Sequence, residues 1–368
     1  MTFNLEAKQR IRAGVIGAGG HSYRNIYPAF QYAPVELVAL ADHHSEKAQA
    51  FARLYGAERW YTEHEDLLAR EKLDAVFISV GLDAQGYPRY PQLAIDAMRA
   101  GCHVWIEKPP AATTAEIEAM QRVSAETNRQ VAVGYKKMFF PAYEKVKEIV
   151  ASSAFGQPAS ASVRYRLSMP PSNERDDQRA WTGFMDICHP ASVLHYLFGP
   201  VDELIYRRAA GGDVAAILTF RQGTVAVMHL TGGQAATGPL ERLEVIGQDA
   251  NVVVENCVHL TYYRRGGSRG CGGYGRATTY IGPDETAPIT WEPEFSLGQL
   301  YNKGLFLEGY AQQIDHFAHC VLSRQAPTRA GLEDAWHLTR LFEAFRYGEE
   351  GKPIRLLALQ PPARNYGK

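Results

Sequence analysis

The first third of the chain alternates short apolar segments with segments in which apolar residues recur at helical spacing. Segments such as "VELVALA" and "DAVFISV" are apolar throughout, as expected of strands that are buried on both faces of a sheet. This alternation predicts a parallel sheet with right-handed helical crossovers. The predicted strands are residues 12–16, 35–41, 75–80, 103–106 and 131–134, and the predicted helices are residues 48–55, 91–100 and 115–127.

The pattern changes at about residue 159, after which strand-like segments follow one another directly. "VAAILTF" and "TVAVMHL" are separated only by "RQG", which is typical of a hairpin and predicts an antiparallel sheet. The glycine-rich "RRGGSRGCGGYGR" predicts a loop. The predicted strands are residues 160–167, 215–220, 224–230, 242–246, 251–254 and 259–263, and the predicted helices are residues 184–198, 308–322 and 332–347.

The length of 368 residues indicates about two domains. A net charge of −1 argues against nucleic acid as the main partner and gives no general attraction to anionic membranes. We see no apolar run of about 18 residues and no secretory signal at the N-terminus. The five cysteines are scattered without a C-x-x-C motif, which favours reduced thiols in a cytoplasmic protein over disulfides or a zinc site.

The segment "AGVIGAGGHS" places a glycine loop directly between the first strand and a helix. Gly17 suits the tight turn, and Gly19 and Gly20 suit the close approach of a pyrophosphate to the helix N-terminus. Ser22 stands where the dinucleotide fingerprint G-x-G-x-x-G has its third glycine, and Asp42 ends the second strand, where an acid accepts from the ribose hydroxyls of NAD. The loop predicts a Rossmann domain that binds NAD, with NADP less favoured. The alternative is a simple tight turn, with Asp42 as a helix cap.

The segment "CHVWIEKPPA" ends a buried strand with Glu107, Lys108 and Pro109. The carboxyl end of a parallel strand is where open α/β sheets bind ligands. A proline after the lysine restricts its backbone and permits a cis peptide bond. The alternative is a solvated Glu–Lys pair on the surface.

The succession "GVIGAGG", "ALAD", "DAVFISV", "AMRAGCHVWIEKPPA" and "VAVGYKKMFFPAY" resembles the Gfo/Idh/MocA oxidoreductases, and the resemblance continues nearly to the end of the chain. It implies an α/β protein with an N-terminal Rossmann doubly wound parallel sheet and a C-terminal α/β domain with an open, mostly antiparallel sheet. We place the NAD(P)-binding domain at residues 1–134 and the substrate-binding and oligomerisation domain at residues 135–368. The resemblance further implies a homodimer or homotetramer, with terminal helices that return to the first domain.

The resemblance also implies roles for single residues. Lys108 matches the catalytic lysine of the family, which supports the reacting oxygen, and Glu107 helps to orient it or contacts the nicotinamide region. Lys136 and Lys137 match a polar or basic pair near the substrate, although a solvated charge pair is the alternative. By residue type alone, and not by the resemblance, a sugar or carboxylated sugar suits Arg164, Arg166 and Trp181, and a dimer interface suits them equally.

His189 matches the catalytic histidine of the family, which acts as a general base. The acid of the family's D-x-x-x-H pattern is displaced, because Met185 holds its position and Asp186 comes one residue later. Asp186 still lies three residues before His189, so the two side chains share a helix face and Asp186 is a candidate for the partner that orients the imidazole. The alternative for His189 is a packed helix residue.

A second departure follows the fourth strand, where Tyr90 replaces a histidine of the family. Tyr87, Arg89 and Tyr90 are therefore expected to shape an unusual pocket. His316 and His319 lack an evident third ligand, so no metal site is expected.

Together these features predict a cytoplasmic, NAD-dependent dehydrogenase that acts on a secondary hydroxyl of a sugar, polyol or sugar derivative. One alternative is a hydrolase or lyase that uses NAD without net redox change. The other is a dinucleotide-sensing regulator without catalysis.

Overall fold

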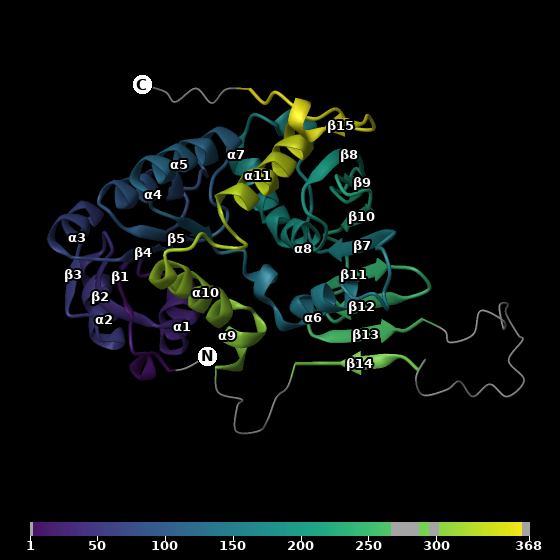
Figure 1. Cartoon of the computed structure of the whole chain (residues 1–368). Helices are drawn as coiled ribbons and strands as arrows, with labels where there is room; N and C mark the ends of the chain where they lie inside the picture. The colour runs from purple at the N-terminus through teal and green to yellow at the C-terminus, as the bar shows by residue number, and fades with distance from the viewer. Residues whose placement is uncertain (1–2, 266–286, 294–301, 363–368) are drawn as a thin grey trace, which may run out of the picture.

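The computed structural model describes residues 3–265, 287–293 and 302–362 (Figure 1). These residues form two sheets and the helices that cover them. Most of the predicted glycine-rich loop lies outside the described residues. No helix in the described part of the chain is both long and apolar enough to cross a membrane.

The N-terminal sheet has six parallel strands in the order β3-β2-β1-β4-β5-β6, which confirms the predicted doubly wound topology. The exposed edge strand β3 was not predicted, because "RWY" is too short to form an apolar run. The strands are β1 (Ile11–Ile16), β2 (Val35–Ala41), β3 (Arg59–Tyr61), β4 (Ala75–Ile78), β5 (His103–Ile106) and β6 (Val131–Val133).

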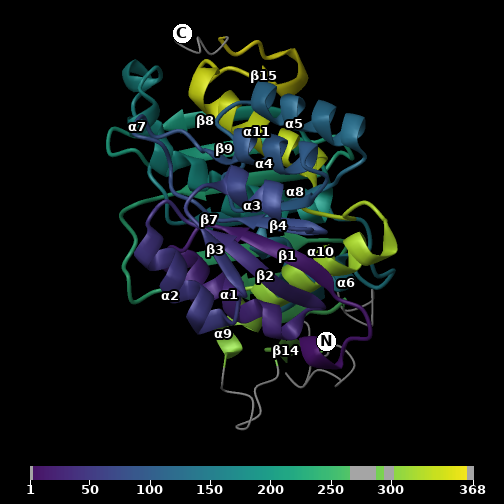
Figure 2. The same cartoon turned by 90° about the vertical axis from the view of Figure 1, so that its left-hand side faces the viewer.

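Helices cover both faces of this sheet, because alternate strand residues point to opposite sides. Ile16, Val76 and Ile78 join the core beneath α4 and α5, whereas Val15 and Phe77 join a second core beneath α1 and α2. Figure 2 shows this sheet with its helices. The helical segments are a 3-10 turn (Asn4–Glu6), a π-helical turn (Ser22–Ile26), α1 (Tyr27–Ala29), a 3-10 turn (Phe30–Tyr32), α2 (Ser45–Tyr55), α3 (His64–Arg70), α4 (Tyr90–Arg99) and α5 (Thr114–Thr127).

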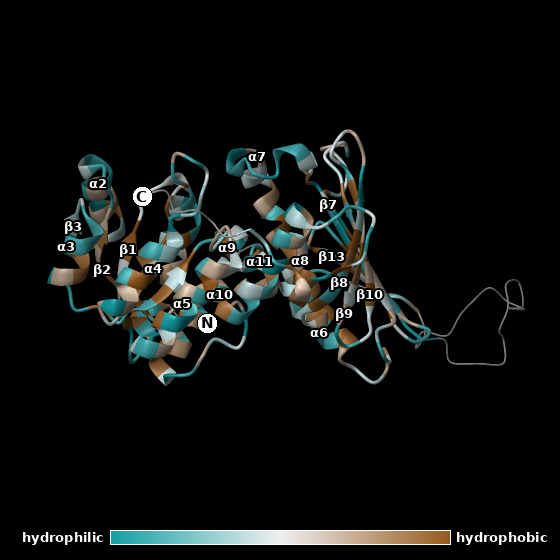
Figure 3. Cartoon of the chain, turned by 90° about the horizontal axis from the view of Figure 1, so that it is seen from above, coloured by the Kyte–Doolittle hydropathy of each residue, from teal (hydrophilic) through white to brown (hydrophobic). Residues whose placement is uncertain are grey.

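Within the described residues, the second sheet has nine strands in the order β14-β13-β12-β11-β7-β10-β9-β8-β15, and only β7 and β10 pair in parallel. This confirms the expected mostly antiparallel sheet. Burial alternates along β10, so one face packs against helices and the other is left open (Figure 3). The strands are β7 (Ser160–Tyr165), β8 (Val201–Arg208), β9 (Val214–Phe220), β10 (Val225–Leu230), β11 (Glu241–Ile246), β12 (Asn251–Glu255), β13 (His259–Tyr263), β14 (Ile289–Trp291) and β15 (Ile354–Arg355).

The helix predicted at residues 184–198 is two segments in the structure. A 3-10 turn covers Gly183–Ile187, and α8 covers Cys188–Phe198. Asp186 therefore lies on the turn that leads into the helix of His189. The neighbouring segments are a 3-10 turn (Lys136–Phe139), α6 (Pro141–Val150), a 3-10 turn (Ser172–Glu174) and α7 (Gln178–Thr182).

The C-terminal helices return to the first sheet. Phe317 of α10 packs edge-on against Phe77 of β4, with ring centroids 5.5 Å apart. Glu343 of α11 accepts a hydrogen bond from the backbone of Thr114 at 2.9 Å. The boundary that we placed at residues 134 and 135 stays a prediction. These last segments are α9 (Lys303–Leu307), α10 (Tyr310–Ser323), α11 (Leu332–Tyr347) and a 3-10 turn (Leu356–Ala358).

Candidate active site

The glycine loop after β1 has room for a ligand on its outer side. Gly17 has a φ of +115°, and a Cβ atom there would lie 2.0 Å from the carbonyl oxygen of Ser79, so the turn requires glycine. A Cβ atom on Gly19 would meet nothing within 4 Å. The loop therefore leaves space beside its backbone, as a bound pyrophosphate requires.

Ser22 replaces the missing third glycine with a hydrogen-bonding role. Its side chain is fully buried. The Oγ atom lies 3.2 Å from the carbonyl oxygen of Gly17 and 2.9 Å from that of Gly19, and it accepts from the Gly19 N–H at 3.0 Å. Ser22 thus fixes the loop. Gly19, Gly20 and Ser79 line a pocket that continues to Lys108.

Asp42 lies immediately after β2, beside the glycine loop. Its carboxylate accepts hydrogen bonds from the backbone N–H groups of Ala18 at 2.8 Å and His44 at 2.9 Å. Burial alone would raise the pKa of Asp42, but these hydrogen bonds outweigh it and hold the pKa below its usual value. Asp42 shares a pocket with His43 and Arg89. The carboxylate is placed to accept hydrogen bonds from the ribose hydroxyls of NAD, and the open glycine loop leaves room for its pyrophosphate.

The ligand atoms of Asp42, His43 and His44 lie within 4.8 Å of one another. Both histidine side chains are mostly exposed, and all three residues occupy the predicted cofactor position. We attach no metal site to them.

Glu107 joins the end of β5 to the glycine loop. It is 4% exposed, its Oε1 lies 3.0 Å from Nε2 of His21, and its Oε2 accepts from the backbone N–H of Lys108 at 3.0 Å. The Lys108–Pro109 peptide bond is cis. The sequence reasoning missed His21, whose one available signal was its position directly after Gly20.

Lys108, Asp186 and His189 come together from distant parts of the chain. The Nζ atom of Lys108 donates to Oδ1 of Asp186 at 3.0 Å. Nε2 of His189 lies 4.0 Å from the same oxygen, which is too far for a hydrogen bond. Asp186 is therefore bonded to the lysine and only near the imidazole.

The two basic groups of this cluster have opposite pKa shifts. Burial lowers the pKa of Lys108, but Cys188 and Asp186 outweigh it, so the pKa lies above its usual value. Burial, followed by the positive charges of Lys137 and Lys108, holds the pKa of His189 well below 6.5. At neutral pH the site therefore contains an ammonium donor beside a neutral imidazole.

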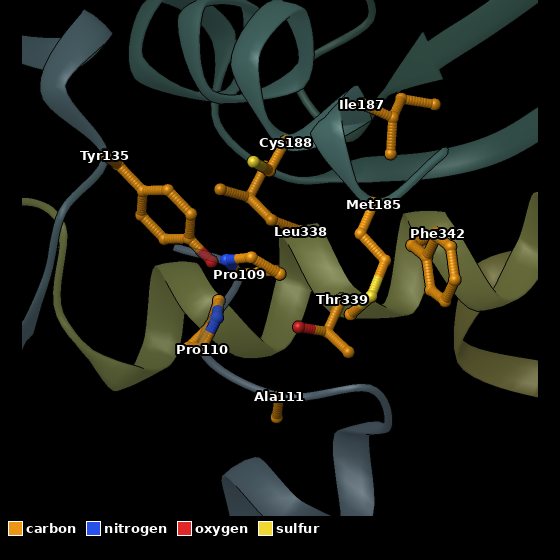
Figure 4. Close-up of a pocket in the computed structure, with 10 residues that line it drawn as sticks. All are labelled: Pro109, Pro110, Ala111, Tyr135, Met185, Ile187, Cys188, Leu338, Thr339 and Phe342. Atoms are coloured by element: carbon orange, nitrogen blue, oxygen red, sulfur yellow. The ribbon is translucent and has the colours of Figure 1, made fainter. Parts of the chain in front are cut away.

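Met185, in the position of the family acid, is buried in an apolar pocket. Its side chain lines this pocket together with Pro109, Cys188 and Phe342 (Figure 4). The sulfur of Met185 accepts a hydrogen bond from the side-chain amide of Gln178 at 3.5 Å, and a carboxylate in this buried position would lose its hydration. Asp186, one residue later, keeps 48% of its side chain exposed and reaches Lys108.

Lys136 and Lys137 are each paired with an acid. Lys136 pairs with Glu308, and its Nζ lies 4.7 Å from the ring centroid of Tyr310. Lys137 is 5% exposed and pairs with the buried Glu241. Sequence reasoning missed Glu241, because only strand register brings β11 beside β7.

The structure does not bring Arg164 and Trp181 to this cluster. Arg164 follows the alternation of β7 onto the face opposite Tyr165, and it donates to the carbonyl of Pro239 at 3.1 Å. Trp181 has no exposed surface and packs edge-on against Phe184, with centroids 5.5 Å apart. A fully buried indole leaves no surface for a substrate, so both side chains serve other contacts here.

The loop between β4 and α4 is held from two sides. Tyr90 is buried and its hydroxyl donates to the carbonyl of Val80 at 2.8 Å. Arg179 of α7 donates through Nε to the carbonyl of Ala84 at 2.9 Å. Helix α7 thereby touches a loop whose base, at Val80, borders the pocket beside the glycine loop.

Comparisons with known proteins match both halves of the chain. The model of an oxidoreductase family with an NAD-binding Rossmann fold matches residues 11–135. The GFO/IDH/MocA C-terminal domain matches residues 143–253. D-apiose dehydrogenase of Paraburkholderia graminis is 24% identical over 96% of this chain and 92% of its own length. Myo-inositol 2-dehydrogenase of Thermotoga maritima is 23% identical over 94% and 98%, respectively.

Solved structures share the fold, and two of them illustrate the similarity. An oxidoreductase from Agrobacterium radiobacter in complex with NAD+, L-tartaric acid and magnesium has a TM-score of 0.75 at 15% identity, over 95% of this chain and 99% of that chain. The WlbA dehydrogenase from Bordetella pertussis in complex with NADH and UDP-GlcNAcA has a TM-score of 0.66 at 21% identity, over 94% and 99%. Since family models cover most of the chain, it belongs to the Gfo/Idh/MocA oxidoreductases, with their NAD-binding Rossmann domain.

Proposed function

We propose that this protein is an NAD-dependent dehydrogenase that acts on a secondary hydroxyl of a sugar, polyol or sugar derivative. The observation that carries the proposal is the Lys108–Asp186–His189 cluster, which lies beside the pocket of the glycine loop. The names of the relatives, D-apiose dehydrogenase and myo-inositol 2-dehydrogenase, support this substrate class.

Gly17, Ser22 and Asp42 would hold the cofactor, which accepts or donates the hydride. His189, kept neutral by burial and by nearby cations, takes the proton of the reacting hydroxyl. Lys108 donates a hydrogen bond to the same oxygen and stabilises its developing negative charge. Asp186 holds the ammonium of Lys108 in place at 3.0 Å.

The preference for NAD over NADP follows from Asp42. A carboxylate at the end of β2 accepts from ribose hydroxyls and repels a 2′-phosphate. We expect calorimetry to give tighter binding of NAD than of NADP, and Asp42→Ala to weaken NAD binding and narrow that gap. Tighter binding of NADP by the intact protein would contradict the role of Asp42.

A panel of sugars and polyols with NAD, followed by NADH absorbance, tests the activity. Lys108→Met should lower turnover by about 10²–10³ with NAD affinity kept, since one preorganised donor is worth that much. His189→Ala should also lose activity, whereas the surface changes Lys145→Met and His319→Ala serve as matched controls.

Wild-type activity in both site variants would remove the catalytic assignment. Product without net NADH would favour the hydrolase or lyase alternative. Cofactor binding without turnover of any compound would favour the regulator.

A cytoplasmic homodimer or homotetramer is also part of the proposal. The open face of the second sheet carries exposed apolar residues at Ile217, Val227 and Ile246, which support association through this face. Light scattering of the purified protein tests the oligomeric state, and a monomer at all concentrations would contradict it.

A further inference from the structure

A second cluster of ionisable groups lies buried behind the proposed catalytic residues. Lys137 and Glu241 are 5% and 4% exposed, and Tyr143 is fully buried. Both the ammonium of Lys137 and the hydroxyl of Tyr143 donate to the carboxylate of Glu241. A buried ion pair contributes little net stability, because the lost hydration of both charges offsets their attraction. An electrostatic role at a neighbouring group would account for its presence.

Tyr165 connects this pair to His189. The register of β11 on β7 places Glu241 directly opposite Tyr165, on the same face of the sheet. The ammonium of Lys137 lies 4.5 Å from the ring centroid of Tyr165. That ring in turn lies 6.2 Å from the imidazole of His189, centroid to centroid. One aromatic ring therefore bridges the ion pair and the imidazole.

Charged groups approach His189 from several elements, and most of them are positive. After burial, the charge of Lys137 is the largest contribution that lowers the pKa of His189. The groups that face His189 are Lys136 and Lys137 after β6, Lys108 after β5, His21 in the glycine loop, and Asp186 on its own turn, with Glu241 of β11 behind Lys137.

We propose that Glu241 is a positioning residue that acts through Lys137 to set the electrostatic field at the imidazole of His189. Glu241 fixes the ammonium against the Tyr165 ring and cancels part of its charge. The positive charge of Lys137 disfavours protonation of the imidazole, and the negative charge of Glu241 weakens this effect. The inference rests on the proposed role of His189 as the base.

The two partners predict shifts of opposite sign. Lys137→Met removes a positive charge, so the pKa of His189 should rise by about one unit. Glu241→Gln leaves the ammonium uncompensated, so the pKa of His189 should fall by about half a unit. If the cluster served only packing, the two substitutions would not shift the pKa of His189 in opposite directions.

NMR titration of histidine side chains in the full chain, with the His189 signal identified by its loss in His189→Ala, measures this pKa without any substrate. Glu244→Gln is the matched control, because it makes the same change on the same strand but on the other face. Lys137→Arg keeps the charge and should leave the pKa within about 0.3 units of wild type.

Removal of one partner of a buried pair destabilises a protein, so either single variant can fail to fold. The double variant Lys137→Met with Glu241→Gln removes both charges, and its His189 pKa should lie above that of wild type. Shifts of the same sign in the two single variants, or less than about 0.3 units in all variants, would overturn the inference.

The pH dependence of kcat/KM separates this inference from the proposed function. If Glu241 and Lys137 act on the base, the acid limb of the profile moves with the titration in each variant. If the titration shifts as expected but the acid limb stays in place, His189 is not the base. The proposed function then fails, while the electrostatic link is upheld.

Discussion

Asp186 is the single residue at which the structure changes the chemical interpretation most. From the sequence it is a candidate partner of His189, yet its hydrogen bond goes to Lys108 at 3.0 Å, and the imidazole lies 4.0 Å away. Asp186→Asn keeps the size but loses the charge that holds the ammonium. We expect kcat to fall on the order of tenfold, as for loss of a charge-assisted hydrogen bond, with the fold intact.

Asp66→Asn is the matched control, because Asp66 is similarly exposed and pairs with Arg70 on the surface. Unchanged kcat in Asp186→Asn would show that Lys108 needs no anchor. A displaced acid limb with unchanged kcat would instead assign Asp186 to His189.

The pKa of His189 fixes the direction of the pH dependence. A general base works in its unprotonated form, and here burial and neighbouring cations hold the pKa well below 6.5. Activity should therefore persist as the pH falls through 6.5 and be lost only at lower pH, as the imidazole takes a proton. The acid limb of kcat/KM measures this, and His189→Ala should abolish it. An acid limb above pH 6.5 would contradict the assignment.

At the scale of elements, the turn that directly follows β1 depends on Gly17. Gly17→Ala would put a Cβ atom 2.0 Å from the carbonyl of Ser79, at a φ of +115°. The loop would have to shift, so we expect NAD affinity measured by calorimetry to fall at least tenfold. Gly211→Ala, where a Cβ atom meets nothing within 4 Å, is the control. Equal affinity in both variants would place the cofactor elsewhere.

The sequence predicts elements well where local pattern determines them. Every strand of the first sheet except β3 lies on an apolar run of the sequence, and the sequence predicts a strand at each of these runs. Residues 184–198 read as one helix, but Gly183–Ile187 forms a 3-10 turn that continues into α8 at Cys188. Periodicity does not show this change of helix type, because both segments have similar apolar content.

The candidate site is predictable only where a motif marks it. Lys108 and Asp42 follow strands, and that position suggests chemistry before any fold is known. Glu241 and Trp181 lie in segments without such a mark. The pairing of β11 with β7 buries Glu241 beside Lys137, and packing against Phe342 of α11 buries Trp181. Both depend on contacts between residues far apart in the sequence, which a local pattern does not contain.

At the scale of the whole molecule, α10 completes a core that begins some 300 residues earlier in the chain. The apolar residues Ala311, Ile314 and Phe317 of this helix are fully buried in the same cluster as Ile11 and Phe77. The sheet that would bind NAD therefore depends on a helix from the far end of the sequence. A substitution that disrupts the packing of α10 should therefore also destabilise the first sheet.

Phe317→Ala tests this dependence. Truncation of a fully buried phenylalanine typically costs about 3–5 kcal/mol, through lost burial and the cavity that remains. We expect urea unfolding to show a loss of that size, and NAD affinity to fall because the sheet beneath the glycine loop loses its support. Leu357→Ala, at a position 60% exposed, is the control and should change stability by less than about 0.5 kcal/mol. A loss of stability below about 1 kcal/mol in Phe317→Ala would contradict this dependence, because a cavity in a shared core costs more than that.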